Sequence, residues 1–201
     1  MHPETDNSDI VLICFLGNPG EKYSKTRHSI GFIFAEKIAA AFNFPQFSYC
    51  RKIKGYVSAG MISGRKTVLL KPDTYMNRSG VAVAKALELF AVGIDNLIVV
   101  HDDVDIKFGS HRIKTKGGSG GHNGLRSIEG EIGTDKFVRI RIGIGKPVPE
   151  MDLADYVLSN FFDGELSFID NSLSSKWGEI ILKIVNEGAE EAMNTFNRRN
   201  G

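Results

Sequence analysis

Short apolar runs alternate with amphipathic segments along most of this chain. The runs at 10–16 (IVLICFL) and 96–100 (NLIVV) are rich in β-branched residues and predict buried strands, and the first ends abruptly at Gly-Asn-Pro-Gly. Between 30 and 42 the apolar residues recur at helical spacing, which predicts an amphipathic helix. The chain therefore begins with a strand and a helix, as expected for an α/β protein.

The remaining pattern continues this alternation. It predicts a loop over 43–54, a β-hairpin over 55–62 and 66–71, a helix over 81–91, strands over 110–116 and 137–143, a helix over 125–132 between them, and helices in the remainder, where Trp177 is expected in the core. These elements predict a single three-layer α/β domain over 1–201, with a mixed, mostly parallel twisted sheet flanked by helices. Residues 1–8 are expected to form a flexible N-terminus.

Polar side chains follow the strand at 10–16. Asn18 comes directly after it, and His28 lies ten residues later, just before the helix at 30–42. In open α/β sheets, ligands bind outside the carboxyl ends of the strands, so we expect both side chains at that edge. A loop histidine can also be solvated or cap a helix, so His28 by itself does not indicate catalysis.

Two carboxylates, Asp102 and Asp103, follow the strand at 96–100. They could bind a metal, cap a turn, or orient a histidine from a neighbouring strand. The sequence has no His-x-x-x-His or Cys-x-x-Cys pair that would complete a coordination shell. We therefore expect no metal and no other cofactor.

The glycine-rich segment 117–124 (GGSGGHNG) precedes the helix at 125–132. Its glycines allow close backbone approach, and the N–H groups at the start of the helix would favour an anion or oxyanion. It lacks the Gly-Lys-Ser/Thr ending of a nucleotide-binding loop and the spacing of a dinucleotide fingerprint, so we expect neither. A polar residue also precedes the helix at 81–91: Asn77 could cap it, as could Ser79, or it could face the site.

Composition and charge narrow the functional classes. The 201 residues are 42% hydrophobic and carry a net charge of +1, so global charge does not mark a nucleic-acid binder. Between 107 and 146, however, nine basic residues face three acidic ones, and Arg139 and Arg141 share one face of a strand, which suits an enzyme acting on a polyanion. Two cysteines are too few for a disulfide framework, and no run approaches the roughly 18 apolar residues of a membrane span. We therefore expect a cytoplasmic protein.

Five segments resemble, in order and spacing, the signatures of bacterial-type peptidyl-tRNA hydrolases. They are FLGNPGEKYSKTRHSIGF, KPDTYMNRSG, VVHDDVDIKFG, GGHNGL and RIRIGIG, and they extend from Phe15 to about Gly145. The resemblance implies a peptidyl-tRNA hydrolase-like fold. It also implies hydrolysis of the ester between a peptide and the 3′-terminal ribose of tRNA, which releases free tRNA and peptide. The enzyme is expected to be a monomer with no obligatory protein partner.

The same resemblance assigns roles to individual residues. It implies catalysis by His28 with support from Asp102, substrate binding by Asn18, Tyr23, Met76, Asn77 and Asn123, binding of tRNA phosphate by Lys114 and Arg141, and a lid with oxyanion-binding backbone at Gly120, Gly121 and His122. The lid departs from the family pattern because it carries Lys116 and Ser119 where glycine or another small residue is expected. This departure concerns the mobility of the lid and not the chemistry.

The implied chemistry is consistent with the residues themselves. An aminoacyl-type ester is already activated, so a general base that deprotonates water and donors that hold the oxyanion suffice, without a metal or a covalent serine. His28, oriented by Asp102, is the expected base. Two other functions remain open. A non-catalytic RNA-binding protein would not need the His–Asp pair, and a nucleoside or small-ester hydrolase would not need Lys114 and Arg141.

Overall fold

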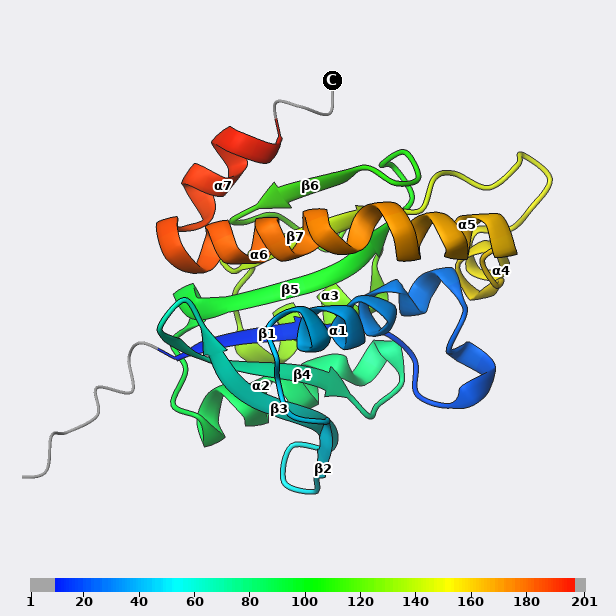
Figure 1. Cartoon of the computed structure of the whole chain (residues 1–201). Coiled ribbons are helices and arrows are strands. Elements are labelled where there is room, and N and C mark those ends of the chain that lie inside the picture. Colours follow the sequence, from blue (N-terminus) through cyan, green and yellow to red (C-terminus); the bar gives the residue numbers. More distant parts are fainter. Residues whose placement is uncertain (1–9, 198–201) are drawn as a thin grey trace, which may run out of the picture.

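Seven strands form one twisted sheet, with β1 (Val11–Phe15) at its middle (Figure 1). The computed structural model describes residues 10–197, apart from the side chains of 172–174, and the segment 1–8, for which flexibility was predicted, lies outside the described residues. The other strands are β2 (Ser48–Cys50), β3 (Gly55–Ile62), β4 (Arg65–Pro72), β5 (Leu97–Asp103), β6 (His111–Lys114) and β7 (Val138–Gly143). Their order across the sheet is β2-β3-β4-β1-β5-β7-β6.

The predicted mixed, mostly parallel sheet is confirmed. The inner strands β4, β1, β5 and β7 are parallel, whereas β3 and β6 run antiparallel to their inner neighbours. The central strand β1 is buried on both faces, because Ile13 and Phe15 belong to one hydrophobic core and Leu12 and Cys14 to the other. This two-sided burial explains why its sequence is continuously apolar.

Helices cover both faces of the sheet and complete the three layers of this single α/β domain (Figure 1). They are α1 (Ile30–Ala41), α2 (Ser79–Leu89), α3 (Asn123–Ile132), α4 (Leu153–Leu158), α5 (Asp163–Phe168), α6 (Ser174–Glu187) and α7 (Ala189–Phe196). One core joins the sheet to α1, α6 and α7 and contains Trp177, as predicted, while α2 and α3 pack on the opposite face. In the described part of the chain, no helix is long and apolar enough to cross a membrane.

Two differences from the predicted elements matter for the edge of the sheet and for the site, whereas the boundaries of β6, α2 and α3 shift by no more than two residues. The predicted loop over 43–54 contains the edge strand β2, which pairs with β3 but is too short to show an alternating pattern. The strand predicted to end at residue 100 continues as β5 to Asp103, because it remains paired with β7. Asp102 therefore lies on the sheet itself, and its backbone is held by the pairing with β7.

A close contact between α1 and β1 positions the histidine that was predicted to be catalytic. A Cβ atom on Gly31 would lie 2.3 Å from the backbone oxygen of Leu16, so only glycine allows this approach. The 3-10 turn η3 (Arg27–Ser29) directly precedes α1, and the N–H of Asn18 donates to Oγ of Ser29 at 3.2 Å. His28 is thereby held beside the end of β1.

Candidate active site

A cavity of about 710 Å³ opens where β1, β4 and β5 end. Of the residues for which roles were predicted, its lining includes Asn18, His28, Met76, Asn77, Asp102, Lys114, Gly120, Gly121, His122, Asn123 and Arg141. Tyr23 is the exception: it lies in the 3-10 turn η2 (Glu21–Tyr23), where the Lys22 ammonium is 4.6 Å from the centre of its ring. The structure therefore does not place Tyr23 in the wall of the cavity.

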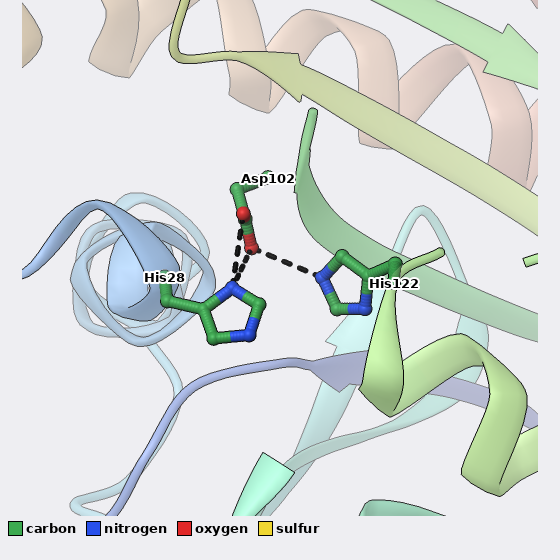
Figure 2. A group of neighbouring side chains, drawn as sticks. All are labelled: His28, Asp102 and His122. Carbon is green, nitrogen blue, oxygen red and sulfur yellow. Dashed lines mark hydrogen bonds and ion pairs between the residues drawn. The ribbon is translucent and has the colours of Figure 1, made fainter. Parts of the chain in front are cut away.

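His28 and Asp102 form a buried pair (Figure 2). Nδ1 of His28 lies 2.9 Å from Oδ1 of Asp102 and 3.0 Å from Oδ2. An ionised carboxylate only accepts hydrogen bonds, so Nδ1 carries the proton and Nε2 keeps its lone pair. Nε2 forms no hydrogen bond to the described residues, and His28 lines the cavity. This is the arrangement of a general base supported by a carboxylate.

The electrostatics favour the same roles. Burial alone would lower the pKa of His28, but the charge of Asp102 and the hydrogen bond to it outweigh this effect and raise the pKa above its ordinary value. For Asp102, burial alone would raise the pKa, but the neighbouring imidazoles of His28 and His122 hold it well below the usual range. Asp102 is therefore an anion at neutral pH, and it increases the basicity of His28.

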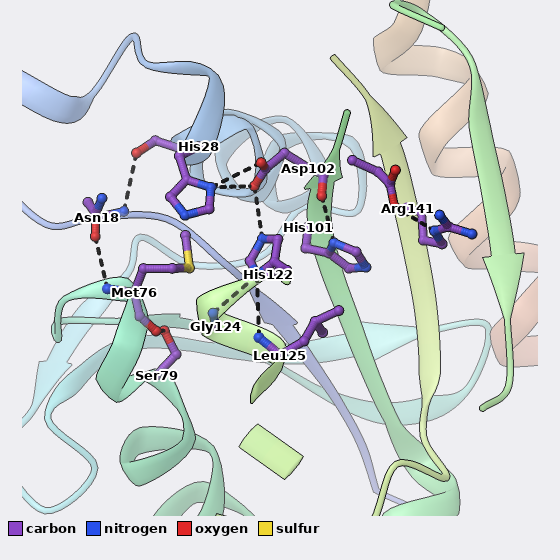
Figure 3. A network of polar contacts seen from close by, with 12 residues as sticks. Asn18, His28, Met76, Ser79, His101, Asp102, His122, Gly124, Leu125 and Arg141 are labelled. Atoms are coloured by element: carbon purple, nitrogen blue, oxygen red, sulfur yellow. Dashed lines mark hydrogen bonds and ion pairs between the residues drawn. The ribbon is translucent and has the colours of Figure 1, made fainter. Parts of the chain in front are cut away.

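His122 provides Asp102 with a second imidazole contact, which was not predicted. Its Nε2 lies 3.0 Å from Oδ1 of Asp102, and its Nδ1 accepts from the N–H groups of Gly124 and Leu125, at 3.1 and 3.3 Å (Figure 3). Because Nδ1 is an acceptor, the ring proton lies on Nε2 and is donated to the carboxylate. His122 thus caps α3 and fixes Asp102 at the same time. Histidine is not among the usual N-cap residues, so only its position just before the helix could have indicated this.

Replacing His122 with alanine is expected to lower the free energy of unfolding by about 0.5–2 kcal/mol, because α3 loses its N-cap. His122→Asn is the matched variant, since asparagine is a good N-cap but is too short to keep the contact with Asp102. We expect urea denaturation to show near-normal stability for this variant. Equal destabilisation of both variants would contradict the capping role.

His28, Asp102 and His122 also bring three potential metal ligands within 4.8 Å of one another. However, the nitrogens that face the carboxylate, Nδ1 of His28 and Nε2 of His122, both carry the ring proton, whereas a neutral imidazole binds a metal through its unprotonated nitrogen. A metal on Nε2 of His122 would move the proton to Nδ1 and break both hydrogen bonds to the start of α3. The donor set therefore suits a hydrogen-bonded triad better than a metal centre.

A third histidine, His101, forms a hydrogen bond with the backbone of Asp102. Its Nδ1 donates to the backbone oxygen of Asp102 at 2.7 Å (Figure 3). Burial, His122 and Arg141 lower the pKa of His101 to about 3, against the opposing effect of Asp102, so the ring is neutral. His101 was not predicted to take part in the site. It lies on β5 and lines the cavity.

The amide of Asn18 is oriented by the backbone beside it. The N–H of Met76 donates to Oδ1 of Asn18 at 2.9 Å (Figure 3). This contact fixes the amide so that Nδ2, a donor, is the group left for a ligand. Met76 itself is buried and lines the cavity, as the resemblance implied.

The other two asparagines also reach the cavity. Asn77 lies exposed in the 3-10 turn η4 (Met76–Arg78), and the N-cap position of α2 is Arg78, whose side chain forms no capping hydrogen bond. Neither Asn77 nor Ser79 is therefore the N-cap, and Asn77 is free to face a ligand. Asn123 begins α3, where its Oδ1 accepts from Arg126 at 3.2 Å.

The glycine-rich loop offers fewer backbone donors than predicted. In the first turn of α3 the N–H groups of Gly124 and Leu125 donate to the His122 ring, and the N–H of His122 donates to the backbone oxygen of Ser119 at 3.0 Å. The N–H groups of His122, Gly124 and Leu125 are therefore not free to hold an oxyanion, because the turn and the cap already use them. Within residues 10–197, the N–H groups of Gly120 and Gly121 have no hydrogen-bond partner, and both glycines line the cavity.

Three cations border the cavity on one face of the β6–β7 pair. Arg139 is buried and donates to the backbone oxygen of Gly118 at 3.0 Å, so it anchors the glycine-rich loop. Arg141 pairs with Asp103, with Nε 2.7 Å from Oδ2, whereas Lys114 is exposed and has no ion pair with any described residue. Lys114 and Arg141, the predicted phosphate-binding residues, thus both reach the cavity. Arg141 is held there by Asp103, for which no role in phosphate binding was predicted.

One wall of the cavity comes from a segment for which no role was predicted. It consists of α4 and the residue before it, with Asp152, Leu153, Ala154, Val157 and Leu158 in the lining. This wall is tied to the turn that carries His28, because the N–H of Arg27 donates to the backbone oxygen of Ser159 and its guanidinium pairs with Glu165 at 2.9 Å. No motif in the sequence indicated these contacts.

A buried imidazole–carboxylate pair with an unshared nitrogen, at the edge of an open α/β sheet, has the geometry that general-base activation of water requires. The family model described as "Peptidyl-tRNA hydrolase" matches residues 12–201. The chain belongs to this family.

Bacterial relatives agree with this assignment. Proteins named peptidyl-tRNA hydrolase from Syntrophotalea carbinolica and Clostridium tetani are 44% and 42% identical to the chain, each over 94% of this chain and 97% of the relative. The crystal structure of peptidyl-tRNA hydrolase from Acinetobacter baumannii has a TM-score of 0.86 at 37% identity and covers 94% of this chain and 95% of that one. The predicted fold is thereby confirmed. A 5′-methylthioadenosine nucleosidase from Arabidopsis thaliana, at TM-score 0.55 and 6% identity, shares the fold alone.

Proposed function

We propose that the chain hydrolyses the ester that joins a peptide, or an N-blocked amino acid, to the 3′-terminal ribose of tRNA, and so releases free tRNA and peptide. The observation that carries this proposal is the orientation of His28. Asp102 holds its Nδ1 at 2.9 Å, and its Nε2 is left unshared at a cavity lined by asparagines. Membership of the peptidyl-tRNA hydrolase family supports the choice of this ester.

The reaction needs one general base that later acts as an acid. Nε2 of His28 takes a proton from water, and the water oxygen attacks the ester carbonyl carbon to form a tetrahedral oxyanion. The intermediate collapses when the bond to the ribose 3′ oxygen breaks, and this oxygen receives the proton from the imidazolium. The carboxylate of Asp102 stabilises the imidazolium between these two steps. The products are a free carboxylic acid and a 3′ hydroxyl group.

Neutral donors around His28 are suited to the oxyanion and to the peptide. We assign three donors to the oxyanion. One is Nδ2 of Asn18, which is left over because Oδ1 already accepts from the N–H of Met76. The others are the N–H groups of Gly120 and Gly121, which have no hydrogen-bond partner among the described residues. We assign Asn77 and Asn123 to the peptide and ribose groups and Met76 to the apolar wall next to the ester. All of these residues border the same cavity.

The direct test is release of the N-acetylated amino acid from N-acetyl-aminoacyl-tRNA. Aminoacyl-tRNA with a free amine and formyl-methionyl initiator tRNA serve as comparison substrates. Turnover that persists in EDTA, with spermidine present to keep the tRNA folded, is expected because the proposed water is activated by an imidazole. Binding of tRNA without turnover would contradict the proposal and favour a non-catalytic RNA-binding protein. Loss of turnover in EDTA, restored by one divalent ion, would contradict the metal-free mechanism.

We further propose that the protein acts in the cytoplasm as a single-domain monomer, on tRNA alone and without a cofactor or an obligatory protein partner. Cys14 and Cys50 are both free thiols, as is usual in a reducing compartment. The proposed substrate arises during translation, which places the reaction in the same compartment.

We propose that Lys114 and Arg141 bind a phosphate of the tRNA, away from the ester. Replacing both with alanine should reduce the slope of log affinity against log salt by about one to two, because fewer counterions are released on binding. The loss in kcat/KM should arise mainly through KM. A short ester model without this phosphate provides the comparison, and an equal loss on both substrates would contradict the assignment.

A further inference from the structure

Asp103 ends β5 and is held on both carboxylate oxygens. Its Oδ2 accepts from Nε of Arg141 at 2.7 Å, and its Oδ1 accepts from the N–H of Asp105 at 2.9 Å. The backbone carbonyl of Asp103 is held as well, because it accepts from the N–H of Ile144 at 3.0 Å. A Cβ on Gly143, its register partner in β7, would lie 2.1 Å from the backbone oxygen of Lys107, so the turn after β5 packs directly on β7. The carboxylate therefore sits in a rigid frame.

This frame determines how the guanidinium of Arg141 is presented. Only Nε is engaged by Asp103, and neither Nη group has a hydrogen-bond partner within residues 10–197. Arg141 lies beside His101 in the register of β5 and β7 and lines the cavity (Figure 3). An arginine held through Nε keeps both Nη donors for another anion, and a phosphate accepts such a pair of parallel hydrogen bonds.

Lys114 supplies a second cation at a suitable position. It is the register partner of Arg139 across the antiparallel pair β6–β7, which makes Arg141 its diagonal neighbour on the same face. Diagonal neighbours in such a pair lie roughly 7–8 Å apart at Cα, which leaves room for one phosphate between two long side chains. Lys114 is exposed and would lose side-chain conformational freedom when it binds a phosphate. Arg141 is already held by Asp103 and would lose less.

We propose that Asp103 is a positioning residue for tRNA binding: it fixes Arg141 so that the two Nη groups face a phosphate at the rim of the cavity. This inference rests on the proposed binding of tRNA phosphate by Arg141. The inference can be distinguished from simple charge repulsion. If Asp103 only repelled the phosphate, removing its negative charge would strengthen the binding of tRNA. If Asp103 instead orients Arg141, its neutralisation weakens binding.

The experiment measures the Kd of deacylated tRNA over a range of salt concentrations, so that it does not depend on turnover. We compare the wild type with Asp103→Asn, Arg141→Ala, the double variant, and Asp105→Asn. Asp105 is the matched control because it lies two residues away and carries the same charge, but pairs with Lys146 and not with Arg141. Asp103→Glu is included as a conservative variant that keeps the carboxylate.

We expect Asp103→Asn to raise Kd about fivefold to tenfold and to lower the salt slope by about one, as Arg141→Ala does. The double variant should be no weaker than Arg141→Ala alone, Asp103→Glu should recover part of the loss, and Asp105→Asn should leave Kd unchanged or slightly lower. On acylated tRNA, the effect of Asp103→Asn should appear in KM, with kcat within about twofold of wild type.

Tighter binding by Asp103→Asn, or an additive loss in the double variant, would overturn the inference. If Arg141→Ala leaves the salt slope unchanged, the phosphate contact fails and the inference fails with it, although the hydrolytic function stands. If tRNA binding behaves as expected but the wild type does not hydrolyse the ester, the proposed function fails alone. Thermal melting of each variant excludes loss of binding through misfolding.

Discussion

Replacing His28 with alanine is expected to lower kcat on N-acetyl-aminoacyl-tRNA by roughly a hundredfold to ten-thousandfold, the usual contribution of a general base. The affinity for tRNA should change little, because the imidazole acts on water and not on phosphate. Single-turnover kinetics with saturating enzyme, together with the Kd of deacylated tRNA, measure the two effects separately.

Two controls make the result on His28 specific. His28→Gln retains a polar side chain of similar length but has no titrating group, so it should be as inactive as the alanine variant if the imidazole is the base. Added imidazole should restore part of the turnover of the alanine variant, because that substitution leaves space beside Asp102 for the free base. Near-normal turnover by a folded His28→Ala protein would contradict the assignment.

Replacing Asp102 with asparagine is expected to lower kcat by about tenfold to a thousandfold, less than the loss of His28 itself. In the structure Oδ1 of Asp102 accepts from both His28 and His122, and Oδ2 also lies 3.0 Å from Nδ1 of His28. An asparagine offers one oxygen and one NH₂ group. When the NH₂ group faces His28, Nδ1 must become the acceptor, and the proton moves to Nε2, where it blocks the base.

The same substitution should shift the pH dependence in a defined direction. His28 acts as a base only when it is unprotonated, so kcat/KM falls as the pH drops below its pKa. Asp102 raises this pKa against the opposing effect of burial. In Asp102→Asn the pKa of His28 should therefore fall, and the acidic limb of the kcat/KM profile should move to lower pH. An unchanged limb would mean that Asp102 does not set the basicity of His28. Asp103→Asn is the comparison, because this neighbouring carboxylate contacts Arg141 and not His28.

Local sequence patterns were sufficient to predict most of the architecture. The apolar run of β1 indicated a strand buried on both faces, and the polar residues after β1 and β5 indicated the edge of the sheet at which the site lies. The short strand β2 could not be predicted, because three residues carry no periodicity and its pairing depends on β3. The burial of a strand can thus be predicted from its own sequence, whereas the pairing of a short edge strand cannot.

The sequence by itself determined which chemical groups this protein has available: an imidazole at 28, a carboxylate at 102, three amides, and a basic segment between 107 and 146. Tertiary structure alone decided how these groups are connected. His122 joins α3 to Asp102, and Asp103 takes Arg141 as its partner, because β5 lies beside β7 in the sheet and the register sets which side chains meet. A hydrogen bond requires the distance between donor and acceptor to be right to within a few tenths of an ångström, and for residues far apart in the chain this distance is fixed only when the whole sheet has formed.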